Sequence, residues 1–184
     1  MRFQDIPPFT RSSSYRVNVG WLHLESTIAS YAADSAQSGI PFEMDPDFQR
    51  AHVWDREKQS RYVEFVLRGG KSSRDILWNC PGWQRTLGLK GRFVLVDGKQ
   101  RLEAVRAFLR GDVPAFGRLF GEFTDKLNPF GPDFMFHVND LDTDAEVLQW
   151  YLDVNSGGVA HTAEEIAMVR GLLEAAKVRE SSRP

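Results

Sequence analysis

The stretch FVLVDGKQRLEAVRAFLRG, residues 93–111, constrains the fold more than any other part of the chain. Residues 93–96 are a short apolar run rich in β-branched side chains, which predicts a buried strand. Apolar residues then recur at helical spacing over 102–109, and Gly111 suits the end of a helix. The chain must therefore pass from a strand into a helix within residues 97–101.

The turn between them, Asp97-Gly98-Lys99-Gln100-Arg101, brings two cations and an amide to the start of the predicted helix. Backbone N–H groups and the positive end of the helix dipole meet there, which favours an anion. Gly98 would let the backbone approach a ligand, and Lys99 and Arg101 add charged donors. The alternative is a solvated helix start with Asp97 as N-cap. The turn matches neither a P-loop nor the GxGxxG fingerprint.

Composition narrows the class of protein. The 184 residues suit one domain of ordinary size. The formal net charge of −2 gives no general basic field, so contact with nucleic acid would need a local patch. The single cysteine, Cys80, excludes an internal disulfide and a multi-cysteine zinc site, and it fits a cytoplasmic location. No apolar run approaches ~20 residues, so no membrane-spanning helix is predicted.

Strand and helix signals alternate along the chain and predict an α+β fold, a small mixed sheet with flanking helices and a C-terminal helical pair. Strands are predicted over 15–19, 75–79, 93–96 and 134–138. Helices are predicted over 22–36, from the N-cap Asp55 to 69–70, before Gly111, and after the capping boxes 143–146 and 162–165. We expect an irregular arm at 1–14, a core at 15–140, and C-terminal helices at 141–184 packed on that core.

Three stretches together resemble a known family. They are residues 47–50 with Val53-Trp54, residues 96–102, and residues 155–158 with Glu164. In this order they resemble the ParB/sulfiredoxin-like fold over about residues 40–170. They are most similar to the branch found in the nucleotide-hydrolysing half of GmrSD-type restriction enzymes. The resemblance implies that residues 98–101 hold the phosphates of a nucleoside triphosphate, in agreement with the chemistry of the turn.

Departures from that branch shape the expected activity. The restriction enzymes add an HNH nuclease module, whereas the four histidines here are scattered. The turn lacks the cysteine of sulfiredoxin, so sulfinic acid repair is not expected. Position 99 is Lys where the restriction branch usually has Gln, and a lysine could follow a transferred γ-phosphoryl group. Small stand-alone members of the branch resemble phage proteins, some of which phosphorylate 5-hydroxymethyluracil in DNA.

The resemblance therefore implies an ATP-dependent DNA kinase that phosphorylates the hydroxyl of a hydroxymethylated base, 5-hydroxymethyluracil, in phage DNA. Its expected partners are DNA carrying modified bases and a nucleoside triphosphate with Mg²⁺, in the host cytoplasm. Two alternatives stay open: an NTP-hydrolysing subunit of a GmrSD-like restriction system, and a nucleotide-gated DNA-binding module without turnover. The sequence indicates neither which nucleotide is used nor the oligomeric state.

Each candidate residue receives a role. The triphosphate is assigned to Gly98, Lys99, Gln100 and Arg101. Asp97, at the end of the strand, is the candidate general base or Mg²⁺ ligand. Arg101 is also assigned to catalysis, with Asp47 as the reserve carboxylate.

Three further residues frame the expected site. Arg50 would reach the phosphates or the acceptor strand, and its alternative is a surface arginine. Gln49 would orient a base or ribose, and its alternative is a loop residue. Asn155 would close over the site, and its alternative is a helix C-cap.

A base within duplex DNA would have to be flipped out to react. Trp54, Trp78 or Trp83 could hold it, although core packing is favoured for the last two. Cys80 is interpreted as a small buried hydrophobe. The sugar-phosphate backbone of the DNA could bind along a run of cationic side chains. The alternative interpretation of these side chains is a solvated helix face. These cations are Arg56, Lys58, Arg61, Arg68, Lys71 and Arg74.

Overall fold

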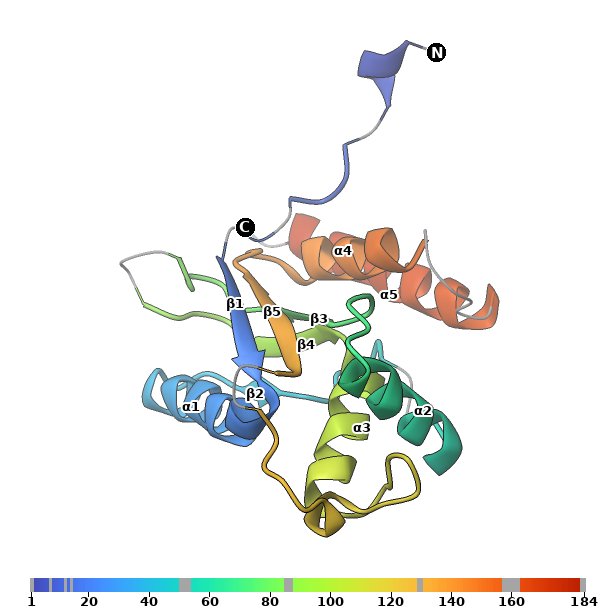
Figure 1. Ribbon diagram of the computed structural model, residues 1–184. Coiled ribbons are helices and arrows are strands. Elements are labelled where there is room, and N and C mark those ends of the chain that lie inside the picture. The colour runs from blue at the N-terminus through green and yellow to red at the C-terminus, as the bar shows by residue number, and fades with distance from the viewer. Residues whose placement is uncertain are drawn as a thin grey trace.

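A five-stranded mixed sheet with helices on both faces forms the centre of the molecule (Figure 1). The computed structural model describes residues 2–6, 8–11, 13, 15–49, 54–84, 88–128, 131–156 and 163–182, with the backbone alone at 156 and 163–165. The strands are β1 (Tyr15–Gly20), β2 (Phe42–Glu43), β3 (Asp75–Asn79), β4 (Phe93–Asp97) and β5 (Asp133–Asn139). Their order is β1-β5-β3-β4-β2, in which the β5–β3 and β4–β2 pairs are parallel and the other two antiparallel. The predicted α+β class is confirmed.

The described residues form five α-helices around the sheet. They are α1 (Leu24–Gln37), α2 (Arg56–Leu67), α3 (Lys99–Arg110), α4 (Asp144–Ser156) and α5 (Ala163–Ser181). Short 3₁₀ turns lie at Phe3–Asp5, Trp21–His23 and Phe120–Glu122. Two of the predicted caps are present: the Asp55 carboxylate accepts the Lys58 N–H at 2.7 Å, and Thr143 and Glu146 bond each other's backbone N–H. The predicted capping box at 162–165 lies outside the described side chains.

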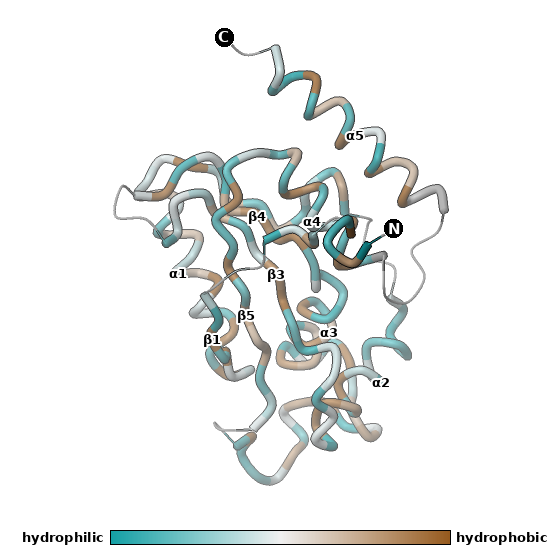
Figure 2. Tube along the Cα trace, turned by 90° about the horizontal axis from the view of Figure 1, so that it is seen from above, coloured by the Kyte–Doolittle hydropathy of each residue, from teal (hydrophilic) through white to brown (hydrophobic). Residues whose placement is uncertain are grey.

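Each face of the sheet buries its own set of apolar side chains. Alternation along β3 sends Ile76 and Trp78 to the face covered by α1, α2 and α3, and Leu77 to the face covered by α4 and α5. Side chains along β4 alternate in the same way. Phe93 and Leu95 lie on the face covered by α1, α2 and α3, and Val94 and Val96 on the opposite face. Figure 2 shows the hydrophobic residues along these central strands. The sheet is thus enclosed at its centre, which fixes β4 and the helix that follows it.

The interior assignments made from sequence are confirmed. Trp78 and Cys80 are fully buried, and Trp83 is partly buried against the same core. The two-residue strand β2 was missed, because the glycine and prolines around it predict only turns. No helix in the described part of the chain is long and apolar enough to cross a membrane.

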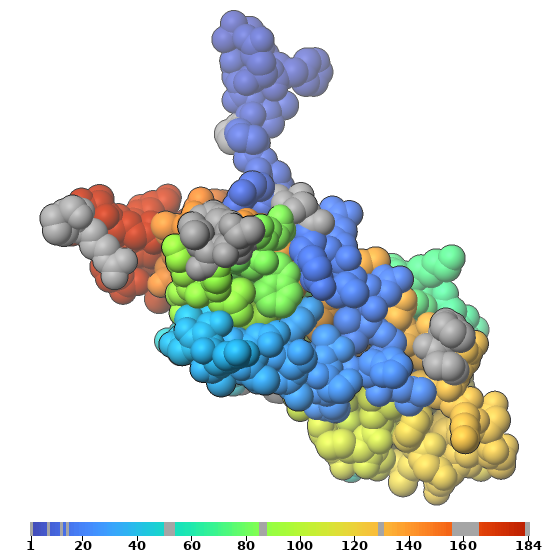
Figure 3. Space-filling model, turned by 90° about the vertical axis from the view of Figure 1, so that its left-hand side faces the viewer, coloured from blue at the N-terminus to red at the C-terminus, as the bar shows by residue number. Residues whose placement is uncertain are grey.

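The N-terminal arm projects from the body of the molecule (Figure 3). Thr10 fixes its base, donating from its backbone N–H and its hydroxyl to Asp153 on α4 at 2.9 and 2.6 Å. Arg11 adds an ion pair with Asp140 at 2.8 Å. The arm is therefore joined to the C-terminal helices rather than to the α1–α3 face.

Candidate functional site

The turn that joins β4 to α3, residues 97–101, is called the β4–α3 corner from here on. Gly98 is the N-cap of α3 and adopts a left-handed conformation, with φ +102° and ψ 4°. Its carbonyl accepts the Leu102 N–H at 2.9 Å, which closes the first turn of the helix. The predicted strand–turn–helix is confirmed.

Gly98 also has a role in the fold. A Cβ at this position would lie 2.5 Å from Ile76 Cδ1 and 3.2 Å from the Asp75 carbonyl oxygen. The positive φ and the closeness of β3 are thus enough to require glycine at this position.

The alternative role for Asp97, as N-cap, is wrong. The residue lies one position before the cap, and its carboxylate accepts the Arg101 guanidinium at 2.6 Å. Arg101 has 20% of its side chain exposed and Asp97 31%. The candidate base and the candidate phosphate ligand therefore form an ion pair one helical turn apart.

Lys99 forms the second ion pair of the corner. Its ammonium group contacts the Asp45 carboxylate, which belongs to the loop after β2. The Lys99 side chain is only 13% exposed, whereas Asp45 is 71% exposed. Side chains two positions apart on a helix point roughly 200° apart. Lys99 and Arg101 therefore flank the helix start on opposite sides.

The guanidinium of Arg101 is incompletely paired. Its Nε is buried and has no hydrogen-bond partner among the described residues. The nearby Tyr62 phenol has its pKa raised, chiefly by burial, while the positive charges of Arg101 and Arg74 oppose the rise. Arg101 therefore lies in a partly buried setting, where charge interactions are stronger than in water.

Two amides attach the preceding loop to the corner. Gln100 Oε1 accepts the Trp54 N–H at 3.0 Å, and Gln49 Nε2 donates to the Leu95 carbonyl at 2.5 Å. Strand β2 has only two residues, so Gln49 continues the pairing of β4 where the strand stops. The Gln49 amide is therefore bound to the protein backbone and does not point to a base or ribose. This contact favours the alternative interpretation of Gln49 as a loop residue.

The remaining predicted residues lie around this region. Asp47 is exposed in the loop after β2. Arg50 falls outside the described residues, as do 51–53 and 157–162. Asn155 lies within α4 and its Nδ2 donates to the Tyr151 carbonyl at 2.7 Å, so the C-cap interpretation is wrong. Tyr151 packs edge-on against Phe48 of the loop after β2, with ring centroids 5.4 Å apart, which links α4 to that loop.

Sequence reasoning missed the partners that come from distant segments. The local pattern around Asp45 indicates only a turn, and nothing in its spacing connects it with Lys99, 54 positions away. A carboxylate–imidazole pair was also missed: His137 Nε2 lies 2.6 Å from Asp75 Oδ1. Asp75 belongs to β3, the strand that packs on Gly98. The parallel pairing of β3 with β5 brings these two residues together.

The proposed DNA-tracking cations are largely engaged by the protein. Arg61 pairs with Glu57, Arg74 with Asp133 at 2.8 Å, and Arg56 with the Asp112 carbonyl. Lys58 lies over the Trp54 ring, 5.0 Å from its centroid. These contacts favour the solvated helix face over a dedicated backbone-tracking surface.

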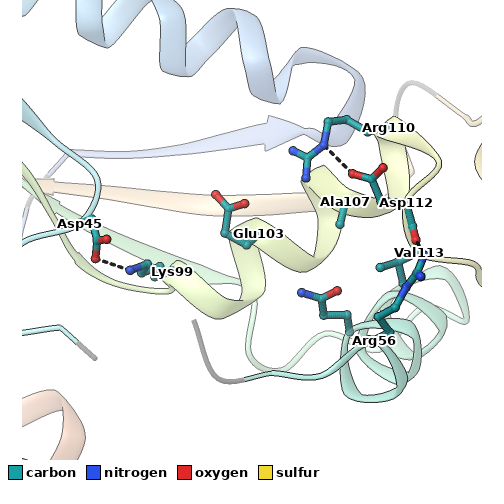
Figure 4. A pocket seen from close by; sticks show the side chains of 9 residues that line it. Asp45, Arg56, Lys99, Glu103, Ala107, Arg110, Asp112 and Val113 are labelled. Carbon is teal, nitrogen blue, oxygen red and sulfur yellow. Dashed lines mark hydrogen bonds and ion pairs between the residues drawn. The ribbon is translucent and has the colours of Figure 1, made fainter. Parts of the chain in front are cut away.

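A groove of about 520 Å³ runs between α2 and α3 and opens beside Lys99 (Figure 4). We call it the α2–α3 groove. Its described lining residues are Asp45, Arg56, Gln59, Lys99, Glu103, Ala107, Arg110, Asp112 and Val113. Its volume lies within the range of small-molecule sites, roughly 300–1,000 Å³.

The described residues contain no cluster of three metal-ligating side chains. A Mg²⁺ ion usually binds through one or two carboxylates together with substrate phosphates. Asp97 would fit such a role only as a single ligand, for a metal that arrives with a triphosphate.

Comparison of the chain with protein-family models, with curated proteins and with solved structures found no match. The geometry of the β4–α3 corner and the chemistry of its side chains are therefore the grounds for a functional proposal.

Proposed function

We propose that the protein is an ATP-dependent phosphotransferase whose triphosphate lies at the β4–α3 corner, within a ParB/sulfiredoxin-like fold. The acceptor is the hydroxyl of a hydroxymethylated base, 5-hydroxymethyluracil, in DNA. The observation that carries the proposal is the pair of shielded cations, Lys99 and Arg101, on either side of the first turn of α3. A helix start with two such cations attracts a polyanion through both the helix dipole and charged hydrogen bonds.

The ion pairs of the corner define how a triphosphate would enter. Asp45 is well exposed, so its pairing with Lys99 is weak and easily exchanged. Arg101 donates from Nη2 to the Asp97 carboxylate, and its Nε has no hydrogen-bond partner among the described residues. Movement of the guanidinium from Asp97 to a phosphate would satisfy the arginine and at the same time release the carboxylate.

The released carboxylate gives the transfer step a proton acceptor. The acceptor hydroxyl oxygen bonds to the γ-phosphorus while the bond from that phosphorus to the β–γ bridging oxygen breaks. ADP leaves with the bonding electron pair, and the hydroxyl proton passes to Asp97. Phosphoryl transfer needs mainly alignment and charge neutralisation, which Lys99 and Arg101 would supply.

A nucleotide-gated binding module is the second candidate. The Asp97–Arg101 ion pair favours it, because the guanidinium occupies the carboxylate that would have to receive the hydroxyl proton. In that case nucleotide binding would exchange the ion pairs of the corner without turnover.

The test is incubation of the purified protein with γ-labelled ATP and Mg²⁺, in the presence of DNA that contains thymine or 5-hydroxymethyluracil. Label on the hydroxymethylated DNA alone is the expected result. Release of free phosphate without labelled DNA would indicate a hydrolase, and nucleotide retained without turnover a binding module. Failure of any nucleotide to bind would overturn the proposal.

Arg101→Ala should abolish nucleotide-dependent activity and leave the fold intact, because alanine suits a helix. Arg106→Ala is the matched control: Arg106 lies on the same helix, is 23% exposed, and pairs with Glu103 at 2.8 Å and Glu25 at 2.6 Å. Full activity in Arg101→Ala, or equal losses in both variants, would contradict a phosphate role for Arg101.

A further inference from the structure

A second hollow of the molecule is apolar and lies at the end of α3 remote from the β4–α3 corner. It has a volume of about 550 Å³. Its apolar lining consists of three leucines and four phenylalanines, Phe108, Phe116, Phe120 and Phe123. We call it the phenylalanine groove. The Phe108 ring packs edge-on against those of Phe120 and Phe123, with centroids 5.4 and 6.1 Å apart, so the core fixes its wall. Polar side chains, Asp125 and Lys126 among them, complete the lining, and an apolar centre with polar groups around it is typical of protein interfaces.

An uncommon backbone conformation presents Phe116 to this groove. Phe116 has φ +51° and Gly117 has φ +72°, and bulky residues rarely adopt such left-handed values. A bridge between Ala115 and Arg118 closes the turn, and the Glu64 carboxylate on α2 accepts the Phe116 N–H at 2.7 Å. The residue is nevertheless 52% exposed. The fold therefore holds an aromatic ring in place at the groove and leaves half of it in solvent, which suits a contact with another molecule.

The N-terminal arm carries apolar side chains that match this groove. Phe3 is 95% exposed, Phe9 59% and Ile6 53%. The base of the arm is anchored by Thr10 and Arg11, and the seven residues from Phe3 to Thr10 span at most ~25 Å. The arm leaves the molecule at the end opposite to the loop after α3, which is coloured gold in Figures 1 and 3 and lines the groove. The arm therefore points away from the groove of its own chain.

We propose that two copies of the chain form a dimer by exchanging arms, so that Phe3, Ile6 and Phe9 of each copy fill the phenylalanine groove of the other. The same contact forms twice about a two-fold axis, which closes the assembly at two copies. The inference does not depend on the nucleotide site, because neither the arm nor the groove includes a residue of the β4–α3 corner.

The buried area decides for a reciprocal exchange. A buried aromatic side chain removes about 150–250 Å² from water, so the exposed parts of the three apolar residues of one arm would bury roughly 400 Å². With an equal area of the groove, one arm buries roughly 800 Å² and two arms roughly 1,600 Å². Specific interfaces bury about 1,200–2,000 Å², and contacts below about 800 Å² are typical of crystal packing. Two arms therefore suffice for a stable dimer, whereas a head-to-tail chain joined by single arms would be marginal.

The first experiment measures the mass of the full chain by size-exclusion chromatography with light scattering over a range of concentrations. Wild-type protein should reach twice the 20.9 kDa of one chain. The double variant Phe3→Ser with Phe9→Ser, and separately Phe116→Ser, should weaken the dimer roughly ten-fold or more, as expected when well-packed interface side chains are removed. All three residues are more than half exposed, so the fold should tolerate the changes. Val178→Ser is the matched control, since Val178 is 64% exposed on α5, and it should leave the dimer unchanged.

The second experiment tests which surfaces meet. Cys80 is fully buried, so introduced cysteines supply the accessible thiols. Mild oxidation of a mixture of Gln4→Cys chains and Lys126→Cys chains should yield a disulfide between positions 4 and 126, identified by mass spectrometry. Gln4→Cys chains mixed with Val178→Cys chains should yield no corresponding disulfide.

Four results would overturn the exchange of arms. A wild-type monomer at every concentration would leave the groove to another partner, and a dimer that survives both the arm and the groove variants would place the interface elsewhere. Equal cross-linking in the two mixtures would show that the arm does not select the groove. A mass that rises beyond two chains would exclude the reciprocal, closed arrangement.

Discussion

Replacing Gly98 by alanine should destabilise the protein substantially, and the structure divides the cost into two parts. The first is conformational, because φ +102° is a region that L residues rarely adopt, at about 1–2 kcal/mol. The second is steric, because the new Cβ would lie 2.5 Å from Ile76 Cδ1 in a fully buried part of the core. Overpacking of this kind costs about 1–3 kcal/mol.

The expected loss is therefore roughly 2–5 kcal/mol, which corresponds to a melting temperature about 4–20 °C lower for a chain of this size. Urea titration monitored by tryptophan fluorescence measures the free energy of unfolding. Gly111→Ala is the matched control: Gly111 has φ +80°, and a Cβ there would meet no atom within 4 Å. Its loss should contain the conformational part alone.

A double-mutant cycle with Ile76→Val isolates the steric part. Valine lacks Cδ1, the atom nearest to the methyl group that alanine introduces, so Gly98→Ala should cost less in the valine background than in the wild type. If Gly98→Ala costs no more than Gly111→Ala, and the cycle shows no coupling, the packing explanation of Gly98 is refuted.

Three further predictions concern Cys80 in the core and Gln49 in the loop after β2. Burial raises the pKa of the Cys80 thiol from 9.0 to about 12, so the native thiol should resist Ellman's reagent at pH 8 while the urea-unfolded chain reacts; equal rates would contradict its burial. Because the folded pKa is the higher one, the contribution of Cys80 to stability is complete below pH 9 and declines as pH rises toward 12, and Cys80→Ala should lack this decline. Gln49→Leu leaves the buried Leu95 carbonyl without its side-chain donor and should cost about 1–3 kcal/mol in urea unfolding while ATP binding to the folded protein persists. Selective loss of ATP binding at wild-type stability would instead restore a ligand role for Gln49.

Local sequence determined most of the elements, whereas the two-residue strand β2 left no local signal of its own. The alternation of residues 75–79, the helical spacing after residue 101 and the caps at Asp55, Thr143 and Gly111 each act within a few residues, so their physical cause is visible in one short window. The same applies to the cationic character of the β4–α3 corner, since both cations belong to a single turn.

Tertiary structure decided what each of these side chains meets. The sheet order places β3 beside β4, and this neighbour leaves no room for a Cβ at Gly98. Lys99 finds its carboxylate 54 residues away, and Gln59 shares a groove with Ala107 because α2 packs along α3. Such pairings depend on how distant segments come together in the core, and no short-range pattern of residues encodes them.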